Sequence, residues 1–264
     1  VYVDGVLNNT ITSVSNGGVY AINLIEQNTY SIYIIIDGNQ SNTITATTTT
    51  TPAIFQNVVA YYKFDETSGD AIDLINGHNI FFFGNFVQGT SGVINKAIKF
   101  IDGRGELPIS IYNNFDNNNY TVSFWFKTFD STKTQILISD YDGSDFAKRK
   151  LFAYVNNQKL RFGFGDNSNN EFIDSTTTIV NNTKYFVQLK YNINGQAILR
   201  INNVTESTYT FINAPQNQNQ IGLGRRQNGT FPLDGIIDEI SFINGQTSAG
   251  VDSDLWNNNQ GITI

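Results

Sequence analysis

The sequence contains no cysteine, no methionine and a single histidine, His78. Without cysteine the chain has neither disulfides nor thiolate metal sites. One histidine rules out a zinc site built from several histidines, and it leaves one candidate base for a Ser-His-Asp arrangement, in a turn that we expect to be exposed. Position 1 is valine, so we expect a processed product or a piece of a longer polypeptide.

Charged residues are also scarce, at 15% of the chain, and the formal net charge is −7. No basic stripe is present, which argues against nucleic acid as a partner. No apolar run reaches the length of a membrane span, so we expect no membrane insertion. Asn, Thr, Ser and Gln must therefore supply the polar surface. Such a surface is typical of secreted or displayed proteins, although a biased genome composition gives the same result. We expect an extracellular or cell-surface location, or alternatively a virion.

Aromatic residues are abundant, with 20 Phe and 13 Tyr. Apolar residues alternate with polar ones in segments such as 120–126 and 185–191. Asn-Gly and Asp-Gly pairs separate these short segments, and such pairs are typical of hairpin turns. Many short strands with regular turns predict an all-β sandwich or barrel. The one helix we expect is a short turn near 253–257.

A run of threonines that ends at Pro52 divides the chain. Such a run is extended and poorly suited to packing, so we assign residues 1–47 to a first module, 48–53 to a linker and 54–264 to a second domain. In the first module, Tyr30 opens a strand that is followed by a turn and a second strand at 43–47. This pattern resembles the C-terminal half of a fibronectin type III domain. Half a sandwich leaves an open face, so the missing half lies upstream or comes from a partner chain.

Six motifs follow one another in the second domain. They are Val58–Leu74, Ala97–Gly103, Tyr120–Lys127, Lys184–Lys190, Ile221–Gly224 and Leu233–Ile240, and a closing Leu255-Trp256-Asn257 ends the series. Their order resembles the laminin G-like, concanavalin A-like jelly-roll family over nearly all of residues 57–261. The resemblance implies two curved antiparallel sheets packed face to face. Many members of this family bind glycans or proteins without catalysis, often beside fibronectin type III modules.

The resemblance also implies a structural calcium ion at one edge of the sandwich. Its ligands here are expected to be Asp73, Asp102 and Asp238, and backbone carbonyls would complete the six to eight oxygens that calcium requires. The alternative is that these residues cap turns, since Asp before Gly is common there.

Two loops carry groups that suit ligand contact. Tyr141, Asp142 and Asp145 offer an aromatic face and acceptors, and Arg225 and Arg226 offer donors to hydroxyl or carboxylate groups. The alternative for each loop is a solvated hairpin tip. Trp125 and Trp256 are expected to be packing residues, because large aromatic side chains mostly build cores.

Catalysis is disfavoured, because the six Glu residues lie far apart in sequence and form no evident pair for glycoside hydrolysis. We therefore expect a non-enzymatic recognition or adhesion module that binds a glycan or a cell-surface protein as part of a larger extracellular bacterial or phage-displayed protein. Two alternatives remain. One is a structural or decoration protein of a virion or surface appendage, with other subunits as partners. The other is an accessory domain of a secreted polysaccharide-degrading enzyme.

Overall fold

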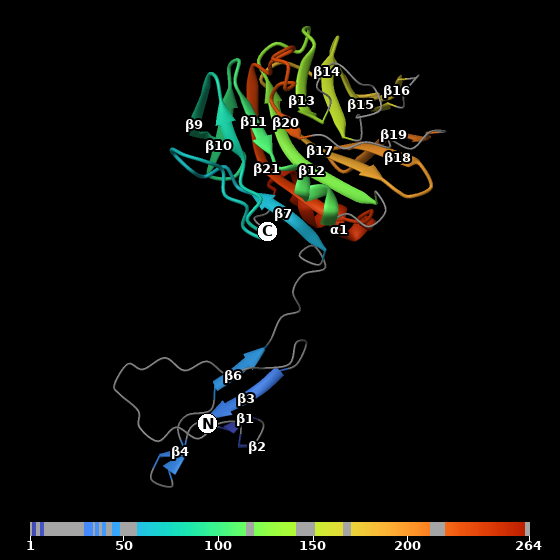
Figure 1. Cartoon of the computed structure of the whole chain (residues 1–264). Coiled ribbons are helices and arrows are strands. Elements are labelled where there is room, and N and C mark those ends of the chain that lie inside the picture. The colour runs from blue at the N-terminus through green and yellow to red at the C-terminus, as the bar shows by residue number, and fades with distance from the viewer. Residues whose placement is uncertain are drawn as a thin grey trace. The chain divides into compact units, whose positions relative to one another are not determined.

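The computed structural model divides the chain into two compact units, residues 1–56 and 57–264. It describes residues 57–114, 119–140, 151–165, 170–211 and 220–261 of the second unit, and six short strands of the first. Figure 1 shows both units. The expected ligand residues Tyr141, Asp142 and Asp145 lie outside the described residues.

The described part of the first unit is a small set of antiparallel strands. Four of them form a sheet in the order β2-β1-β3-β6, and β4 pairs with β5. The predicted hairpin is present as β3 and β6, which pair from Thr29 with Thr47 to Ile32 with Ile44. The resemblance to fibronectin type III stays a prediction. The strand bounds are β1 Tyr2–Val3, β2 Val6–Leu7, β3 Thr29–Tyr33, β4 Ile35–Ile36, β5 Asn39–Gln40 and β6 Ile44–Thr47.

The second unit is the predicted sandwich of two antiparallel sheets. Eight strands form one sheet, in the order β19-β18-β17-β12-β21-β10-β9 with β7 also paired to β21. Their bounds are β7 Val58–Tyr62, β9 Phe86–Ser91, β10 Lys96–Phe100, β12 Tyr120–Thr128, β17 Tyr185–Tyr191, β18 Gln196–Ile201, β19 Val204–Thr210 and β21 Gly235–Asn244.

Seven strands form the second sheet, in the order β16-β15-β14-β13-β20-β11-β8. Their bounds are β8 Phe81–Phe83, β11 Arg104–Leu107, β13 Gln135–Ser139, β14 Phe152–Asn156, β15 Lys159–Gly165, β16 Asn170–Asp174 and β20 Ile221–Leu223. A short 3-10 helix, η2, spans Ile109–Asn114.

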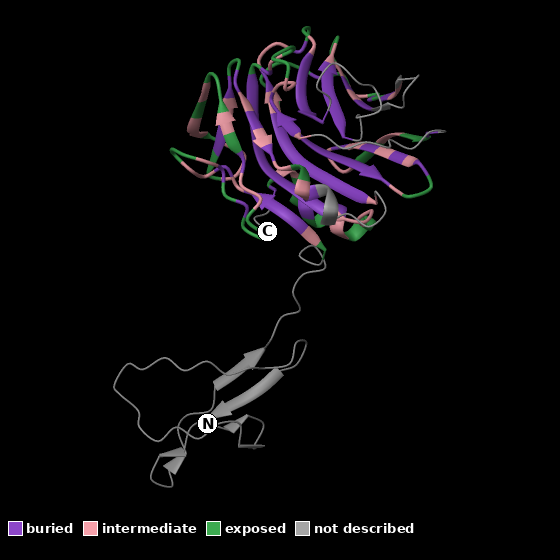
Figure 2. Cartoon of the chain, viewed as in Figure 1, coloured by how far each residue is buried: buried purple, intermediate pink, exposed green. Residues whose placement is uncertain are grey.

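Alternation along the strands builds the core. In β12, Val122, Phe124 and Phe126 belong to the main core cluster, and in β17 Val187 and Leu189 do so. Successive side chains of a strand point to opposite faces, so these residues face the other sheet and their neighbours face outward. Figure 2 shows that burial follows the central strands and that exposure collects at the turns.

Strand β21 has a forked edge. Residues 235–237 pair with β10, whereas residues 240–243 pair with β7. Asp238 and Glu239 lie at the fork, where Glu239 has a φ of 49° and the register against β12 shifts. A β-bulge of this kind redirects a strand and its side chains.

Helix α1, Ala249–Trp256, is longer than the single turn that the sequence suggested. The side chain of Ser248 caps its first turn by accepting a hydrogen bond from the Val251 amide, and Asn257 ends it in the left-handed conformation. Both are standard helix boundaries.

An ion-pair network fixes α1 on the outer face of the eight-stranded sheet. Asp252 is 1% exposed and accepts from Lys190 Nζ at 2.6 Å and from Gln188 Nε2 at 2.9 Å. Arg200 Nε lies 3.4 Å from the same carboxylate. The helix thereby covers part of one outer face of the sandwich.

Candidate functional site

The outer face of the seven-stranded sheet carries one row of residues in register across all seven strands. The row, called here the outer row, is Phe81, Glu106, Gly222, Ser139, Phe152, Gly163 and Phe172. At ~4.8 Å between neighbouring strands it spans about 29 Å. Its two ends are aromatic and its middle is small or polar.

One end of the outer row forms an exposed edge cluster, defined as Phe81, Phe83, Arg104, Glu106 and Gln220. Phe81 and Phe83 are 51% and 45% exposed, although both are large apolar side chains. The Arg104 guanidinium lies 5.3 Å from the centroid of the Phe83 ring. Arg104 also forms an ion pair with Glu106, and Gln220 Nε2 donates to the other carboxylate oxygen of Glu106 at 3.1 Å. The cluster therefore joins two aromatic faces to fixed polar groups.

The opposite end of the outer row is a more buried aromatic group. Phe152 and Tyr154 lie 4.7 Å apart between ring centroids, and Phe172 meets Tyr154 edge to face at 5.9 Å. The Arg161 guanidinium lies 5.8 Å from the Phe172 ring and contacts both oxygens of Asp174, at 2.6 and 3.1 Å. Only the margin of this group is exposed.

The two predicted arginines lie on the same outer face but diverge. Arg225 Nη2 is 3.7 Å from the position that a Cβ on Gly84 would take, close to the end of β8. Its Nε is buried and has no hydrogen-bond partner among the described residues. Arg226 instead lies 5.2 Å from the Phe152 ring and 4.8 Å from the exposed Phe231 ring. Arg225 is thus near the edge cluster and Arg226 is over the buried aromatic group.

Two of the three predicted calcium ligands have the geometry of turn-capping residues. The carboxylate of Asp73 accepts four backbone N–H groups, from Tyr61, Ile75, Asn76 and His78, which uses the acceptor sites of a carboxylate. Asp102 Oδ1 accepts from the Asn85 amide at 3.2 Å. In the described ranges no group of three or more His, Asp or Glu residues is placed to hold a metal ion, and the calcium site with its three ligands stays a prediction.

The third, Asp238, has a different role at the fork of β21. Its Oδ2 accepts from the amides of Val93 and Ile94 at 2.6 and 3.1 Å, and it thereby holds the β9–β10 turn. Burial raises the pKa of Asp238 to about 7, although these two hydrogen bonds act to lower it. Burial likewise raises the pKa of Glu239 to about 8, although the Tyr61 hydroxyl donates to its carboxylate.

The expectations for Trp125 and for His78 can be compared with the structure. Trp125 is 1% exposed and packs 5.1 Å from Phe186, so its assignment to packing is confirmed. His78 is half-buried rather than exposed, which corrects the expectation. Its ring Nδ1 lies 3.2 Å from Ser110 Oγ, and its carbonyl accepts from the Tyr62 hydroxyl.

The edge cluster was missed in the sequence because its members come from β8, from β11 and from the residue just before β20. The available signal was the run Phe81-Phe82-Phe83, in which a strand must expose alternate side chains. Pairing Arg104 with Phe83 and Glu106 with Phe81 requires the register of β8 and β11, which the sequence does not provide.

The described topology and the motifs agree with one family model. Residues 102–250 match the model of the concanavalin A-like lectin/glucanases superfamily, laminin G type. The chain belongs to this superfamily. Among curated proteins, none matches this concanavalin A-like chain.

Several solved structures share the concanavalin A-like fold. Domain 4 of an extracellular arabinanase from Geobacillus stearothermophilus, in complex with arabinotriose, has a TM-score of 0.58 at 17% identity, over 78% of this chain and 98% of that domain. The binding domain of Paraclostridial Mosquitocidal Protein 1 has a TM-score of 0.63 at 16% identity, over 78% and 53% of the two chains. The binding domain of botulinum neurotoxin serotype D/C has a TM-score of 0.60 at 14% identity, over 77% and 52%.

These similarities show the fold, and the named neighbours are mainly binding domains. The chain spans about half the length of the two toxin domains. Within the described part of the chain, no helix is long and apolar enough to cross a membrane.

Proposed function

We propose that the sandwich is a non-catalytic carbohydrate-binding module of a larger extracellular protein, and that the edge cluster is its main binding surface. The observation that carries the proposal is the exposure of Phe81 and Phe83 beside fixed polar groups. Exposed aromatic rings offer the apolar faces that sugar rings stack on, and the polar groups offer donors and acceptors for hydroxyls.

The neighbouring polar groups are held in place before a ligand arrives. Arg104 Nη1 donates to the Gln227 carbonyl at 2.7 Å, in addition to its contact with Glu106. A preorganised site loses less side-chain entropy on binding, so this arrangement favours recognition of a polar ligand that also presents an apolar face.

The proposal agrees with three of the structural neighbours. The arabinanase domain is described in complex with arabinotriose, and the toxin domains are described as binding domains. Protein receptors remain an alternative class of partner, because a related toxin domain is described in complex with rat synaptotagmin II.

Glycan-array binding followed by titration calorimetry tests the proposal. Both Phe81→Ala and Phe83→Ala are expected to weaken binding of a neutral oligosaccharide about tenfold, because each loses a stacking face of ~1.4 kcal/mol. Val87→Ala is the matched control, since Val87 is 45% exposed but lies on β9 of the other sheet. Unchanged affinity in both phenylalanine variants, or no glycan bound by the wild type, would contradict the proposal.

A further inference from the structure

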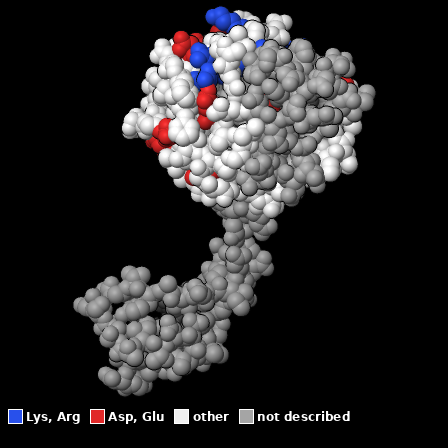
Figure 3. Space-filling model, in the orientation of Figure 1, with Lys and Arg blue, Asp and Glu red and all other residues white. Residues whose placement is uncertain are grey.

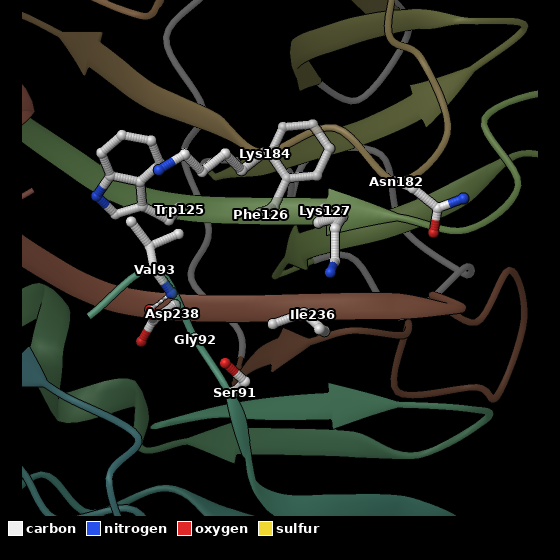
Figure 4. A pocket seen from close by; sticks show the side chains of 10 residues that line it. All are labelled: Ser91, Gly92, Val93, Trp125, Phe126, Lys127, Asn182, Lys184, Ile236 and Asp238. Atoms are coloured by element: carbon white, nitrogen blue, oxygen red, sulfur yellow. Dashed lines mark hydrogen bonds between the residues drawn. The ribbon is translucent and has the colours of Figure 1, made fainter. Parts of the chain in front are cut away.

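A small pocket opens on the opposite outer face, that of the eight-stranded sheet. It has a volume of about 160 Å³ and is lined by Ser91, Gly92, Val93, Trp125, Phe126, Lys127, Asn182, Lys184, Ile236 and Asp238. Figure 4 shows the Lys184 side chain running to Trp125, with Asn182 at the far end of the pocket. The volume is below the ~300–1,000 Å³ of a drug-sized site, so it suits one sugar residue or its acidic substituent.

Cross-strand pairing places one lysine on each side of Ile236, a residue that lines the pocket. Ile236 of β21 pairs with Lys99 of β10 on one side and with Lys127 of β12 on the other. The ammonium groups of Lys99 and Lys127 lie 5.0 and 5.5 Å from the centroid of one ring, that of Phe129. A single aromatic ring therefore holds two positive charges near each other.

A third ammonium group reaches the pocket from the start of β17. Lys184 Nζ lies 5.5 Å from the Trp125 ring and donates to the Asn259 carbonyl at 3.0 Å. Both contacts fix the position of the charge without neutralising it. Trp125 is itself packed against Phe186, so the ammonium group rests on a rigid surface.

No carboxylate of the described residues forms an ion pair with Lys99, Lys127 or Lys184. Asp238 lines the pocket, but it is 1% exposed and its Oδ2 is occupied by the amides of Val93 and Ile94. Like charges held close together, as those of Lys99 and Lys127 are beside Phe129, repel one another, and a bound anion would offset that repulsion. In a chain of net charge −7, this group of cations is a local exception.

We infer that this pocket is a second glycan site, specific for a sugar residue that carries an acidic group. Lys127 and Lys184 contact the acidic group, Lys99 adds to the positive field, and Asn182 and Ser91 at the rim contact hydroxyls. The inference extends the proposed function to a separate face, so acidic and neutral glycans bind to different surfaces of the sandwich. Figure 3 shows that charged side chains occupy a limited part of the described surface in that view.

The test is titration of the whole chain with sialyllactose, an oligogalacturonate, a sulfated disaccharide and lactose. The wild type is expected to bind at least one acidic sugar, and K127Q/K184Q is expected to weaken that binding about tenfold or more. Raising the salt concentration from 0.1 to 1 M shortens the Debye length from about 10 to 3 Å and should weaken binding too. The sulfated sugar separates recognition of a sulfate from that of a carboxylate.

The control K133Q/K159Q removes two charges elsewhere, because Lys133 pairs with Asp130 and Lys159 donates to the Thr176 carbonyl. Its affinity should equal that of the wild type. The inference would be overturned if the wild type bound only neutral glycans, or if both double variants lost the same affinity for acidic sugars. Either result would leave the proposal for the edge cluster unaffected. Acidic binding that is lost in Phe81→Ala and kept in K127Q/K184Q would also overturn it. Failure to bind any glycan would remove the proposed function as well.

Discussion

The two outer faces of the sandwich differ in how they use charge. On the eight-stranded sheet, Asp252 of helix α1 is buried against Lys190 of β17. On the seven-stranded sheet, Arg161 and Asp174 form an ion pair whose side chains remain 33% and 43% exposed. In both pairs a basic side chain meets an aspartate, but the two pairs lie in different dielectric environments.

This difference separates stability from recognition. Removing one partner of a buried pair leaves an uncompensated charge in the interior, whereas removing one partner of an exposed pair leaves a solvated side chain. We therefore expect the part of the eight-stranded sheet beneath α1 to contribute to folding, whereas the edge cluster and the pocket beside Trp125 are the surfaces proposed for ligands.

The largest effect is expected from Asp252→Ala. This change leaves Lys190, which is 4% exposed, without its carboxylate, and it should lower the free energy of unfolding by about 3–5 kcal/mol. Urea denaturation followed by tryptophan fluorescence measures the change. A loss below ~1 kcal/mol would show that the buried network does not differ from the exposed pair.

A smaller effect is expected from pH. The pKa of Asp238 is raised from 3.8 to about 7 in the folded chain, so the folded state binds its proton more tightly than the unfolded state. The stabilisation is complete below pH 3.8 and is lost as pH rises through 7, which amounts to about 2–3 kcal/mol between pH 5 and 8.

Denaturation at pH 5, 6, 7 and 8 measures this slope. Asp238→Asn keeps an oxygen for the amides of Val93 and Ile94 and should show a slope reduced by that amount. The remaining slope is expected to come from Glu239, whose pKa is also raised. A full wild-type slope in Asp238→Asn would refute the assignment.

The smallest effect is expected from Arg161→Ala on the open face. An exposed ion pair contributes about 0–1 kcal/mol, so the midpoint of urea denaturation should hardly move. If loss of the ion pair causes any shift of this midpoint, the midpoint of the variant should no longer depend on the salt concentration. A loss comparable with that of Asp252→Ala would remove the contrast between the two faces.

Much of the fold could be predicted, because alternation of apolar residues is a local signal. The segments 120–126 and 185–191 are the strands β12 and β17, as their period of two indicated. The length of helix α1 could not be predicted, because its apolar face is weak and the helix is held by the ion pair between its own Asp252 and Lys190 of β17. That contact joins residues 62 positions apart in the chain.

The candidate site could be predicted only in part. Arg225 and Arg226 were chosen as loop donors, and the structure places them on the open face, although their guanidinium groups diverge. For Asp73, a carboxylate in a turn looks the same in sequence whether it binds an ion or accepts from four backbone amides, as it does in the structure. Backbone geometry decides whether the partner of such a carboxylate is an ion or an amide. Backbone geometry also decides the pairing of β8 with β11, which forms the edge cluster.

The pairing of β7 with β21 determines how the sandwich responds to mechanical force. β7 begins at Val58, beside Ile243 near the end of β21, and the amide of Asn244 donates to the Asn57 carbonyl at 2.8 Å. A pull outward on residue 57 therefore loads this outermost backbone hydrogen bond first, and the hydrogen bonds between β7 and β21 then break one after another. In single-molecule stretching β7 should detach at low force, and the rest of the sandwich should unfold later. A single high-force rupture would show that the ladder is loaded in shear instead.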